Sequence, residues 1–575
     1  MILPRNFPKG RTMNTMIFSP LDYYLQEGEQ IHAQNTAAYW DLLSKTSNVN
    51  TEENATTVAE YNEGVMHAKS IEQQIKKNKN SRGLTIAGVI LLWIFCPILF
   101  AFSLSLFWKA FLSTTLFLCG LTVLILTCKR INKRLQDLRQ QLSQAEAHAE
   151  ELLQIAYTQT APLNALFTEY DAYKLANKTF PHLAFDTYFT QERWQQLQSF
   201  GFDDESESDE TVLDLLSGSF YGYPFLYKRE LSYYMGFKKY HGSLTIHWTT
   251  EKHTSDGKTE TVHHSQTLHA TVQKPYPFYY HETLLYYAND EAPDLHFSRC
   301  HAHVEDKSDN QIERKIRYGT RKLEKLMAKS AKKDGNFTAL NNTEFEVLFN
   351  ALNRDDEIQF RYLFTPLAQE NMLKLLRSNE GFGDDFDFIK DGKINVIRSE
   401  HSQFSPLHIP SSTYQSHDVA LAEQKFKQTN HSFFKSVFFD FAPLMLIPAY
   451  QQPLLACDTF EEGNLTTHSF EAIATRIRQT QPTDADVGVI YKTELAKREN
   501  NVYTVNVSAF SFRAEKRVQY VPEYGDDGDI HDVPVEWFEY IPVTKTSAIQ
   551  IVPEKELQEI PQHAIRYQGF IAFPL

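Results

Sequence analysis

The sequence predicts an α+β protein in which N-terminal helices with a two-helix transmembrane hairpin are followed by a large mixed α+β cytoplasmic body. Three observations support this prediction. Residues 84–128 are mostly apolar with Lys109 as their only charged residue, apolar residues recur at helical spacing on both sides of that segment, and strand-like alternation begins near residue 244. At 575 residues the chain exceeds what one hydrophobic core usually serves, so several folded units are expected.

The apolar segment at residues 84–128 predicts two membrane-spanning helices. As one straight helix it would be roughly 65 Å long, whereas the hydrocarbon core of a bilayer is about 30 Å thick. The chain is therefore expected to cross the bilayer twice. The turn is predicted near Trp108 and Lys109, because an aromatic ring and a cation suit the membrane interface.

The distribution of cations around this segment predicts its orientation. The loop between the two spans offers Lys109 alone, while the flanks carry Lys69, Lys76, Lys77, Lys79, Arg82, Lys129, Arg130, Lys133, Arg134 and Arg139. Since Lys and Arg concentrate on the cytoplasmic side, both termini are predicted to be cytoplasmic and the protein to lie in the inner membrane. The lipid bilayer is then its first expected partner.

The segments that flank the spans are predicted to be helices, at residues 1–83 and 129–178. Ser19 followed by Pro20 reads as a helix start, and a second helix is expected from about residue 51. After the spans, a heptad seam is formed by Ile131, Leu135, Leu138, Leu142, Ala145, Ala149, Leu152 and Ala156. It is expected to pack on the 65–75 helix face of the same chain, the alternative being pairing between chains in a homo-oligomer.

The rest of the chain is predicted to form an α+β domain at residues 179–400 and a C-terminal α+β extension at 401–575. Alternation around Leu244 and around Leu268, on either side of an Asp256-Gly257 turn signal, predicts a β-hairpin. Further strands are expected within 487–491, 502–512 and 548–552, and helices within 309–333 and 464–479. The apolar run at 433–448 contains Lys435 and Asp440, so a buried core segment is expected there.

One segment resembles a known family. Residues 336–400 contain an acid beside an aromatic residue (Glu344, Phe345), an Asp pair (Asp355, Asp356) and the run Leu363-Phe364-Thr365-Pro366 before an amphipathic helix. This order resembles the bacterial membrane proteins of domain of unknown function family 3137, over about residues 180–400. The resemblance implies a transmembrane pair near the N-terminus followed by a cytoplasmic domain. It implies no activity, because none is established for that family.

The strongest cluster of metal-ligand residue types is His296, Cys300, His301 and His303. Its spacing matches no recognisable zinc pattern, and adjacent residues of a strand point to opposite faces. Only a helix through residues 297–304 would bring these side chains together. A strand or loop with scattered histidines is therefore predicted, and no catalytic site, metal or cofactor is expected.

Other titratable groups are predicted to be surface features. His247, His263 and His269 should share the hairpin face opposite Leu244 and Leu268. The acids Asp384, Asp385 and Asp387, and the acids Asp526, Asp527 and Asp529, are expected in solvated turns because neither group matches a calcium loop.

The helix expected at 309–333 is strongly basic. Its candidate anionic-lipid contacts are Arg314, Lys315, Arg317, Arg321, Lys322 and Lys325, since cations near anionic lipid are stabilised by about 1 kcal/mol each. The alternative is a solvated face, or one paired with the protein's own acids. Nucleic acid is not expected as a partner of the whole chain, whose net charge is −15.

These observations favour a membrane-anchored cytoplasmic interaction or scaffold protein that binds other proteins at the cytoplasmic membrane face. One alternative is a membrane-tethered metal-dependent hydrolase that uses the His and Asp groups. The other is a small channel or transporter component built from oligomerised hairpins. That alternative ranks last because ion pathways usually place ionisable groups at membrane depth and the two spans carry none. No GxSxG or HExxH motif occurs.

Overall fold

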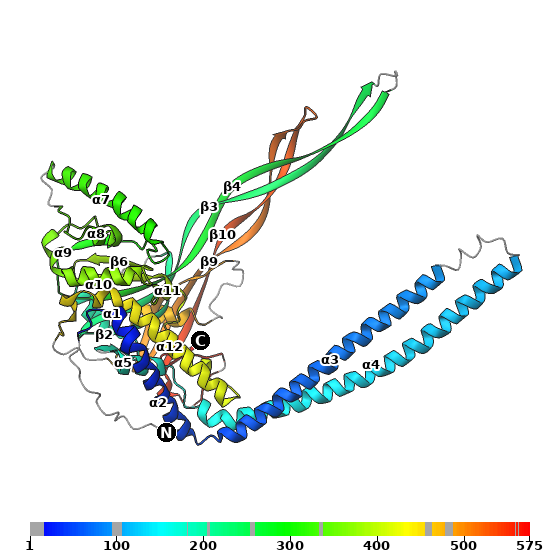
Figure 1. Ribbon diagram of the computed structural model, residues 1–575, viewed down its shortest axis with the longest axis horizontal. Helices are drawn as coiled ribbons and strands as arrows, with labels where there is room; N and C mark the ends of the chain where they lie inside the picture. Colours follow the sequence, from blue (N-terminus) through cyan, green and yellow to red (C-terminus); the bar gives the residue numbers. More distant parts are fainter. Residues whose placement is uncertain are drawn as a thin grey trace. The chain divides into compact units, whose positions relative to one another are not determined.

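Two antiparallel β-sheets organise most of the chain in the computed structural model (Figure 1). The first has the strand order β1-β2-β3-β4-β7-β6-β5 and the second the order β11-β12-β10-β9-β8. The strands of the first sheet are β1 (Leu183–Phe185), β2 (Glu210–Phe220), β3 (Tyr223–His253), β4 (Thr259–Ala288), β5 (His296–Arg299), β6 (Phe386–Asp391) and β7 (Ile394–Ser399). Those of the second are β8 (Ile490–Glu499), β9 (Val502–Tyr524), β10 (Ile530–Pro553), β11 (Ile565–Tyr567) and β12 (Phe570–Pro574). The expected α+β class is confirmed.

The structure describes residues 16–94, 106–180, 182–203, 208–253, 259–332, 337–454, 460, 463–477, 487–557, 559–561 and 563–575. These residues divide into two units. The first unit comprises residues 1–35, 169–409 and 430–575, and the second comprises 36–168 and 410–429. Both sheets belong to the first unit.

The two sheets share one apolar core. It contains Val212 and Leu215 from β2, Val505 and Val507 from β9, and Ile551 from β10. Helix α13 (Thr467–Ala474) packs against β2 and β8 and adds Phe470 and Ile473 to the same core. The remaining helices of this unit are α5 (Asp171–Thr179), α6 (Gln191–Ser199), α7 (Asp309–Ala331), α8 (Thr343–Phe349), α9 (Glu357–Leu363), α10 (Pro366–Arg377) and α11 (Glu400–Phe404).

Helix α12 (Val419–Met445) carries a run of buried phenylalanines. Phe441 is fully buried, and its ring contacts those of Phe220 on β2 and Phe225 on β3, with centroid distances of 4.7 and 5.1 Å. Phe180, at the end of α5, approaches the ring of Phe438 to 4.9 Å. The prediction of a buried core segment at 433–448 is confirmed.

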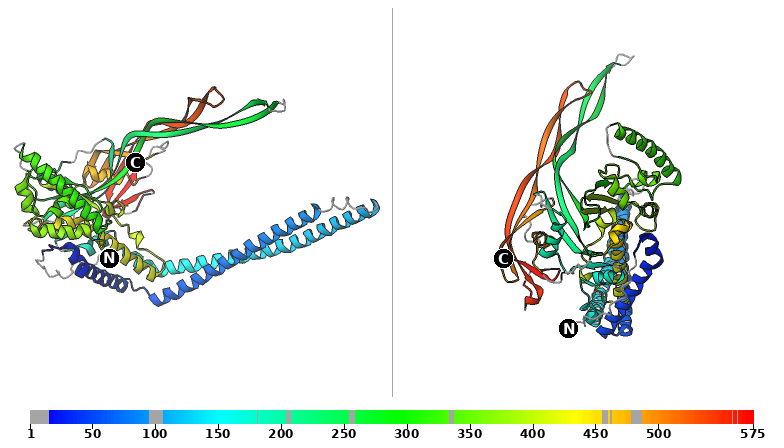
Figure 2. Two further views of the ribbon diagram at one scale, coloured as in Figure 1. Left: turned by 45° about the horizontal axis from the view of Figure 1, so that its top comes forward. Right: turned by 90° about the vertical axis from the view of Figure 1, so that its left-hand side faces the viewer.

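The hairpins β3–β4 and β9–β10 are much longer than ordinary strands, and together they form what we call the arm. Each hairpin extends beyond the shared core, and Figures 1 and 2 show the two running side by side. The predicted β-hairpin is confirmed, with Leu244 paired with Leu268, while the expected Asp256-Gly257 turn lies outside the described residues. In the second hairpin Tyr524 pairs with Ile530 across the acidic turn.

A separate small core holds the two hairpins of the arm together. Its buried members are Ile246, Leu268, Ala270, Val272, Val533 and Val535. Gly242 marks the closest approach, because a Cβ atom there would lie 2.2 Å from the carbonyl oxygen of Pro534. The hairpins therefore pack backbone to backbone at this point, which only glycine permits.

Two long helices dominate the second unit, α3 (Thr51–Ile94) and α4 (Leu106–Asn164), preceded by most of α2 (Glu29–Ser47). Ile71 and Ile75 of α3 form a buried cluster with Leu135 and Leu138 of α4, and Leu142 packs beside it. This pairing confirms the expected packing of the heptad seam on the 65–75 face of the same chain. The helix start expected at Pro20 is also found, in α1 (Pro20–Tyr23), which continues through the π-helical segment η1 (Tyr24–Gly28) into α2.

The predicted transmembrane hairpin is corrected by the structure. Among the residues that the structure describes, no helix contains an apolar stretch long enough to cross a membrane. The apolar segment is divided between the ends of α3 and α4, whose remaining turns carry polar and charged residues. Trp108 and Lys109, where the turn was predicted, lie in the first turns of α4, and residues 95–105 lie outside the described part. The transmembrane prediction is therefore wrong on this finding. So are the inner-membrane location and the cytoplasmic placement of both termini that were inferred from it.

Lys390 on β6 predicts a measurable dependence of stability on pH. Its ammonium group is buried and donates to the carbonyl oxygens of Gly392 (2.7 Å) and Glu291 (3.1 Å). Burial lowers the pKa of Lys390 from its usual 10.5 to about 7. Above pH 7 the unfolded chain therefore binds a proton that the folded chain has released, so the folded state gains stability as the pH rises.

We expect this gain to be about 2 kcal/mol between pH 7 and pH 9, relative to a Lys390→Met variant that cannot titrate. Urea unfolding of both proteins at pH 7, 8 and 9 measures it. A difference between the two proteins that stays constant with pH would contradict the lowered pKa.

Candidate functional site

The outer face of the β9–β10 hairpin is rich in exposed apolar side chains. Cross-strand pairing places Tyr524 beside Ile530, Tyr520 beside Pro534, and Val518 beside Glu536 on one face of the hairpin. The opposite face carries Val533 and Val535, which are fully buried against the β3–β4 hairpin. Because side chains alternate along a strand, burying one face of this two-stranded hairpin leaves the other uncovered.

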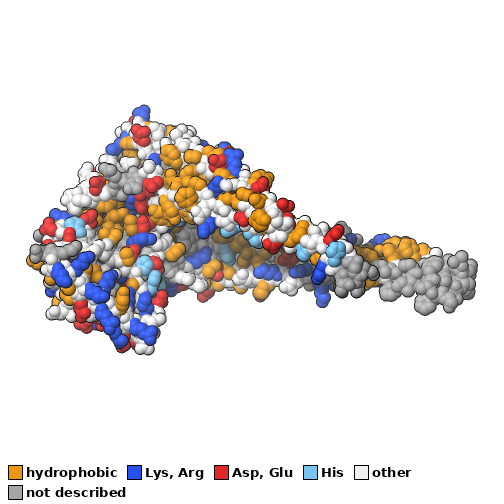
Figure 3. Space-filling view, turned by 90° about the horizontal axis from the view of Figure 1, so that it is seen from above, with side chains coloured by type: hydrophobic (Ala, Val, Ile, Leu, Met, Phe, Trp, Pro, Cys, Tyr) orange, Lys and Arg blue, Asp and Glu red, His pale blue; other side chains and the backbone are white. Residues whose placement is uncertain are grey.

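We call Val518, Tyr520, Tyr524, Ile530 and Phe538 the outer tip face. Tyr524, Ile530 and Tyr520 are 70%, 68% and 65% exposed, which is unusual for such large apolar groups. Figure 3 looks down on the molecule and shows hydrophobic side chains between charged ones along the arm. Contiguous exposed apolar groups of this kind mark interaction surfaces.

The outer tip face carries one ion pair and the opposite face of the hairpin another, while Asp532 is exposed on the outer tip face with no ion pair among the described residues. Lys516 forms an ion pair of 2.7 Å with Glu536, and Arg517 forms one of 2.8 Å with Glu539. In the turn, Asp527 accepts a hydrogen bond of 2.8 Å from the ring of His531. The expectation that Asp526, Asp527 and Asp529 lie in a turn is confirmed.

The outer face of the β3–β4 hairpin differs in character. His247, His263 and His269 are exposed on it, as predicted. Thr245 and Thr267 pair across the strands with 3.0 Å between their hydroxyl oxygens, and His241 bonds to Thr271 at 2.9 Å. The part of this face near the tip is polar, whereas nearer the core the same face carries Met235 and Phe237, which are 48% and 72% exposed and pair with Pro277 and Pro275.

The structure separates the four predicted metal-ligand candidates. His296 lies on β5, where its two ring nitrogens contact Asp355 (2.7 Å) and Asp391 (3.2 Å). Cys300 is exposed and free. Residues His296–Arg299 form strand β5 and a loop follows them. The segment therefore does not form the helix that would have brought the four candidate ligands together.

His301 and His303, however, converge on Glu400 at the start of α11. The Nε2 atoms of His301 and His303 lie 3.1 and 3.7 Å from the Glu400 Oε1 atom. On the other side of each ring, His301 Nδ1 contacts Asp387 at 2.7 Å and His303 Nδ1 contacts Glu305 at 3.5 Å. We call His301, His303 and Glu400 the His-Glu tripod; they offer one ligand atom each within 4.8 Å of one another.

The acids at 384–387 are not in a solvated turn, and that prediction is wrong. Asp384 is fully buried and paired with the buried guanidinium of Arg299. Asp385 contacts the ring of His401 at 2.5 Å. Asp387 accepts from His301, so each of the three acids has a cationic or histidine partner 16 to 86 residues away in the sequence. Local sequence pattern cannot show such distant partners.

A buried network surrounds His401. Its Nε2 atom lies 3.3 Å from Asp440 on α12, and Tyr227 donates to that carboxylate at 3.1 Å. Burial raises the pKa of Asp440. Burial lowers the pKa of His401 but the carboxylates of Asp440 and Asp385 outweigh it, so its pKa is raised overall. The Phe382 ring stacks on His401 with 3.8 Å between the ring centroids, and this buried network suits a structural role.

The predicted lipid-contact residues lie on α7. Ile312 and Leu323 bury one side of this helix, and Gly319 packs closely on Val347 of α8. The candidates Arg314, Arg317, Arg321, Lys322 and Lys325 are exposed, and Lys315 is half-buried with its pKa lowered by burial. Within the described residues, none of the six pairs with an acid, so the contact prediction stays untested.

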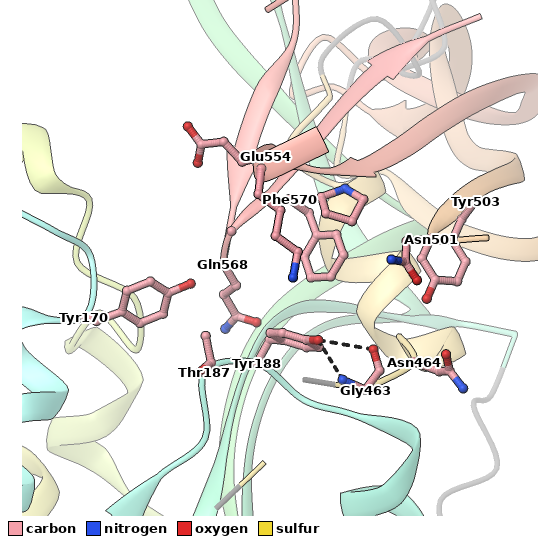
Figure 4. A pocket seen from close by; sticks show the side chains of 13 residues that line it. Tyr170, Thr187, Tyr188, Gly463, Asn464, Asn501, Tyr503, Glu554, Gln568 and Phe570 are labelled. Atoms are coloured by element: carbon pink, nitrogen blue, oxygen red, sulfur yellow. Dashed lines mark hydrogen bonds between the residues drawn. The ribbon is translucent and has the colours of Figure 1, made fainter. Parts of the chain in front are cut away.

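A pocket of about 610 Å³ lies where β9, β10 and β12 meet the loops near Tyr188 and Gly463 (Figure 4). The Tyr188 hydroxyl accepts from the backbone N–H of Gly463 (2.8 Å) and donates to its carbonyl (3.1 Å), and its ring contacts Phe570. Asn464, Asn501 and Gln568 add amide groups to the lining. Aromatic rings and amides suit a neutral polar ligand, but nothing in this lining resembles a reaction centre.

The sequence pattern pointed neither to Glu400, which completes the His-Glu tripod, nor to Glu305, which contacts His303, and it placed Asp387 in a solvated turn. The outer tip face was not predicted either. The alternation of Val518, Tyr520 and Tyr524 was available as a signal for that face. No family model matches the chain, and neither the curated proteins nor the solved structures include a significant match. The resemblance noted for residues 336–400 therefore stays a prediction.

Proposed function

We propose that this chain is a self-associating interaction protein, in which the arm of one copy binds the same arm of a second copy. The observation that carries the proposal is the outer tip face, an exposed apolar stripe on a hairpin whose other face is already buried. It replaces the membrane-anchored scaffold that the sequence suggested.

The size of the stripe supports an interface. From the exposed fractions of its members, the outer tip face presents on the order of 500 Å² of apolar side chain, since a large aromatic residue buries 150–250 Å². Standard stable interfaces bury about 800 Å² per partner. The stripe therefore supplies the apolar centre of such an interface, and the neighbouring prolines and ion pairs supply its rim.

The chemistry of the stripe favours a second copy as the occupant. Two identical hairpin faces can meet about a two-fold axis, with the same residues on both sides. Sheets pack face to face at about 10 Å through interdigitating apolar side chains, which a second outer tip face provides. The Lys516–Glu536 pair on this face carries no net charge, so two copies do not repel each other at this pair, and the exposed Asp532 has to lie at the solvated rim of the interface.

The test is the oligomeric state of the purified full chain, measured by sedimentation velocity over a hundredfold range of concentration. We expect a dimer, and we expect the Tyr520→Ser/Tyr524→Ser double variant to be monomeric or to dissociate at least tenfold more readily. Serine removes the aromatic ring of each tyrosine and, because it is polar, still suits an exposed position on the strand.

A matched control is Tyr318→Ser on α7, which removes an aromatic ring that is 75% exposed but lies outside the arm. This control should dimerise like the unaltered chain. A chain that stays monomeric throughout, or a dimer equally stable in the double variant, would overturn the proposal, and a monomer would point to a different protein as partner.

A further inference from the structure

We propose that the His-Glu tripod is a binding site for a divalent transition-metal ion, with zinc as the ion that its ligands fit best. His301 and His303 supply neutral imidazole nitrogens and Glu400 a carboxylate oxygen. Nitrogen and carboxylate ligands of this kind are what zinc takes in protein sites. This inference does not depend on self-association of the arm.

The spacing of the three ligand atoms matches a metal site. For a tetrahedral ion with bonds of about 2.0–2.1 Å, neighbouring ligand atoms are about 3.3 Å apart. The distances of the two histidine Nε2 atoms from Glu400 Oε1 are 3.1 and 3.7 Å, on either side of that value. Small side-chain adjustments therefore suffice to bind the ion.

The far side of each imidazole is already oriented by a carboxylate. Asp387 contacts His301 Nδ1 at 2.7 Å, and Glu305 contacts His303 Nδ1 at 3.5 Å. A carboxylate that accepts the Nδ1 proton fixes the tautomer whose Nε2 lone pair faces the metal. Both histidines of the tripod have this partner and share Glu400 as their second carboxylate, whereas among the described residues the two acids at His296, Asp355 and Asp391, contact no second histidine.

The loop that carries the two histidines is held firmly. The backbone N–H groups of Ala302 and Val304 donate to the buried carboxylate of Asp384, at 3.0 and 3.3 Å, and that of His301 donates to Asp387 at 2.8 Å. His303 itself has a φ angle of +46°, in the left-handed region that residues other than glycine seldom adopt. The two rings consequently project toward the same carboxylate although only one residue separates them.

The tripod is reachable from solvent. The side chains of His301, His303 and Glu400 are 26%, 41% and 51% exposed, so an ion can enter without any opening of the fold. Three protein ligands leave a fourth tetrahedral position, which water or an anionic group of a ligand would fill. The alternative for the same geometry is a set of histidine–carboxylate ion pairs with no metal.

Titration of Zn²⁺ into chelator-treated full chain, followed by calorimetry, tests the proposal. We expect one strong equivalent, with affinity lowered at least tenfold in Glu400→Gln and in His303→Ala. Asp387→Asn should weaken binding by about 10–100-fold, because it removes the group that orients His301. His296→Ala and Cys300→Ser are matched controls from the same segment and should leave the affinity unchanged.

Replacement of Zn²⁺ by Co²⁺ gives a second readout. A nitrogen and oxygen site should show the intense visible absorption of tetrahedral Co²⁺ without a thiolate charge-transfer band, and Glu400→Gln should abolish it. Circular dichroism of each variant verifies that it remains folded. Failure to bind Zn²⁺ at micromolar concentration, or binding that Glu400→Gln leaves intact, would overturn the assignment and leave the ion pairs as the explanation.

Discussion

An Asp186→Ala variant is expected to lose about 3–5 kcal/mol of unfolding free energy, the cost of leaving a buried charge without its partner. Asp186 follows β1, and its carboxylate accepts from Arg193 Nε and Nη2, both at 2.8 Å, with both side chains fully buried. The hydroxyl of Ser217 (2.8 Å) and the N–H of Phe460 (2.9 Å) donate to the same carboxylate. Removal of Asp186 leaves the positive charge of Arg193 buried in the interior without this carboxylate.

Urea or guanidinium unfolding followed by far-UV circular dichroism measures this loss. The control is Glu499→Ala, which removes the acid of an exposed ion pair 2.6 Å long with Lys497 and should change stability by less than about 1 kcal/mol. Equal effects of the two substitutions would show that the buried pair is not a special stabilising element.

A His401→Leu variant should have an effect of similar size. It would leave Asp385 and Asp440 as two buried carboxylates with no cation between them, at a cost of about 3–5 kcal/mol near neutral pH. His401 has a raised pKa in the folded protein, chiefly because the Asp440 and Asp385 carboxylates overcome the effect of burial. The stabilisation that protonated His401 gives to the folded state is therefore fully present below about pH 6.5. It is lost as the pH rises through the pKa of His401 in the folded protein.

The difference in stability between the unaltered chain and His401→Leu should consequently narrow at alkaline pH. Unfolding at several pH values between 5 and 9 measures this trend. A His401→Leu/Asp440→Asn double variant is expected to recover part of the loss, because one uncompensated charge is gone. A difference that grows with pH, or no recovery in the double variant, would argue against the proposed charge network.

The two proposals can fail independently. Self-association is tested by Tyr520 and Tyr524 at the outer tip face, and metal binding by Glu400 and His303 in the tripod. The substitutions lie on different elements, and none removes a residue of the shared core. A metal-dependent change in oligomeric state would be an additional observation, required by neither proposal.

Local pattern alone determined several features of this protein. Alternation indicated the β-hairpin that contains Leu244 and Leu268, the heptad seam placed Leu138 on the helix face that contains Ile71, and a continuous apolar run marked Phe433–Pro448 as core. Each depends on periodicity within one or two neighbouring elements, which the order of residues states directly. The same reasoning wrongly predicted membrane-spanning helices at 84–128, since among the described residues no helix is long and apolar enough to cross a membrane.

Only the tertiary structure decided the rest. The tripod joins His301 to Glu400 and Asp387, and the arm joins Val272 to Val533, across separations that no periodicity encodes. The buried acids Asp384 and Asp385 were predicted to lie in a solvated turn. An acidic run has the same sequence pattern whether its carboxylates face water or pair with cations from distant segments. Charge pairing and close backbone approach arise when distant segments meet, so the sequence supplies the side chains and the fold alone decides which of them become partners.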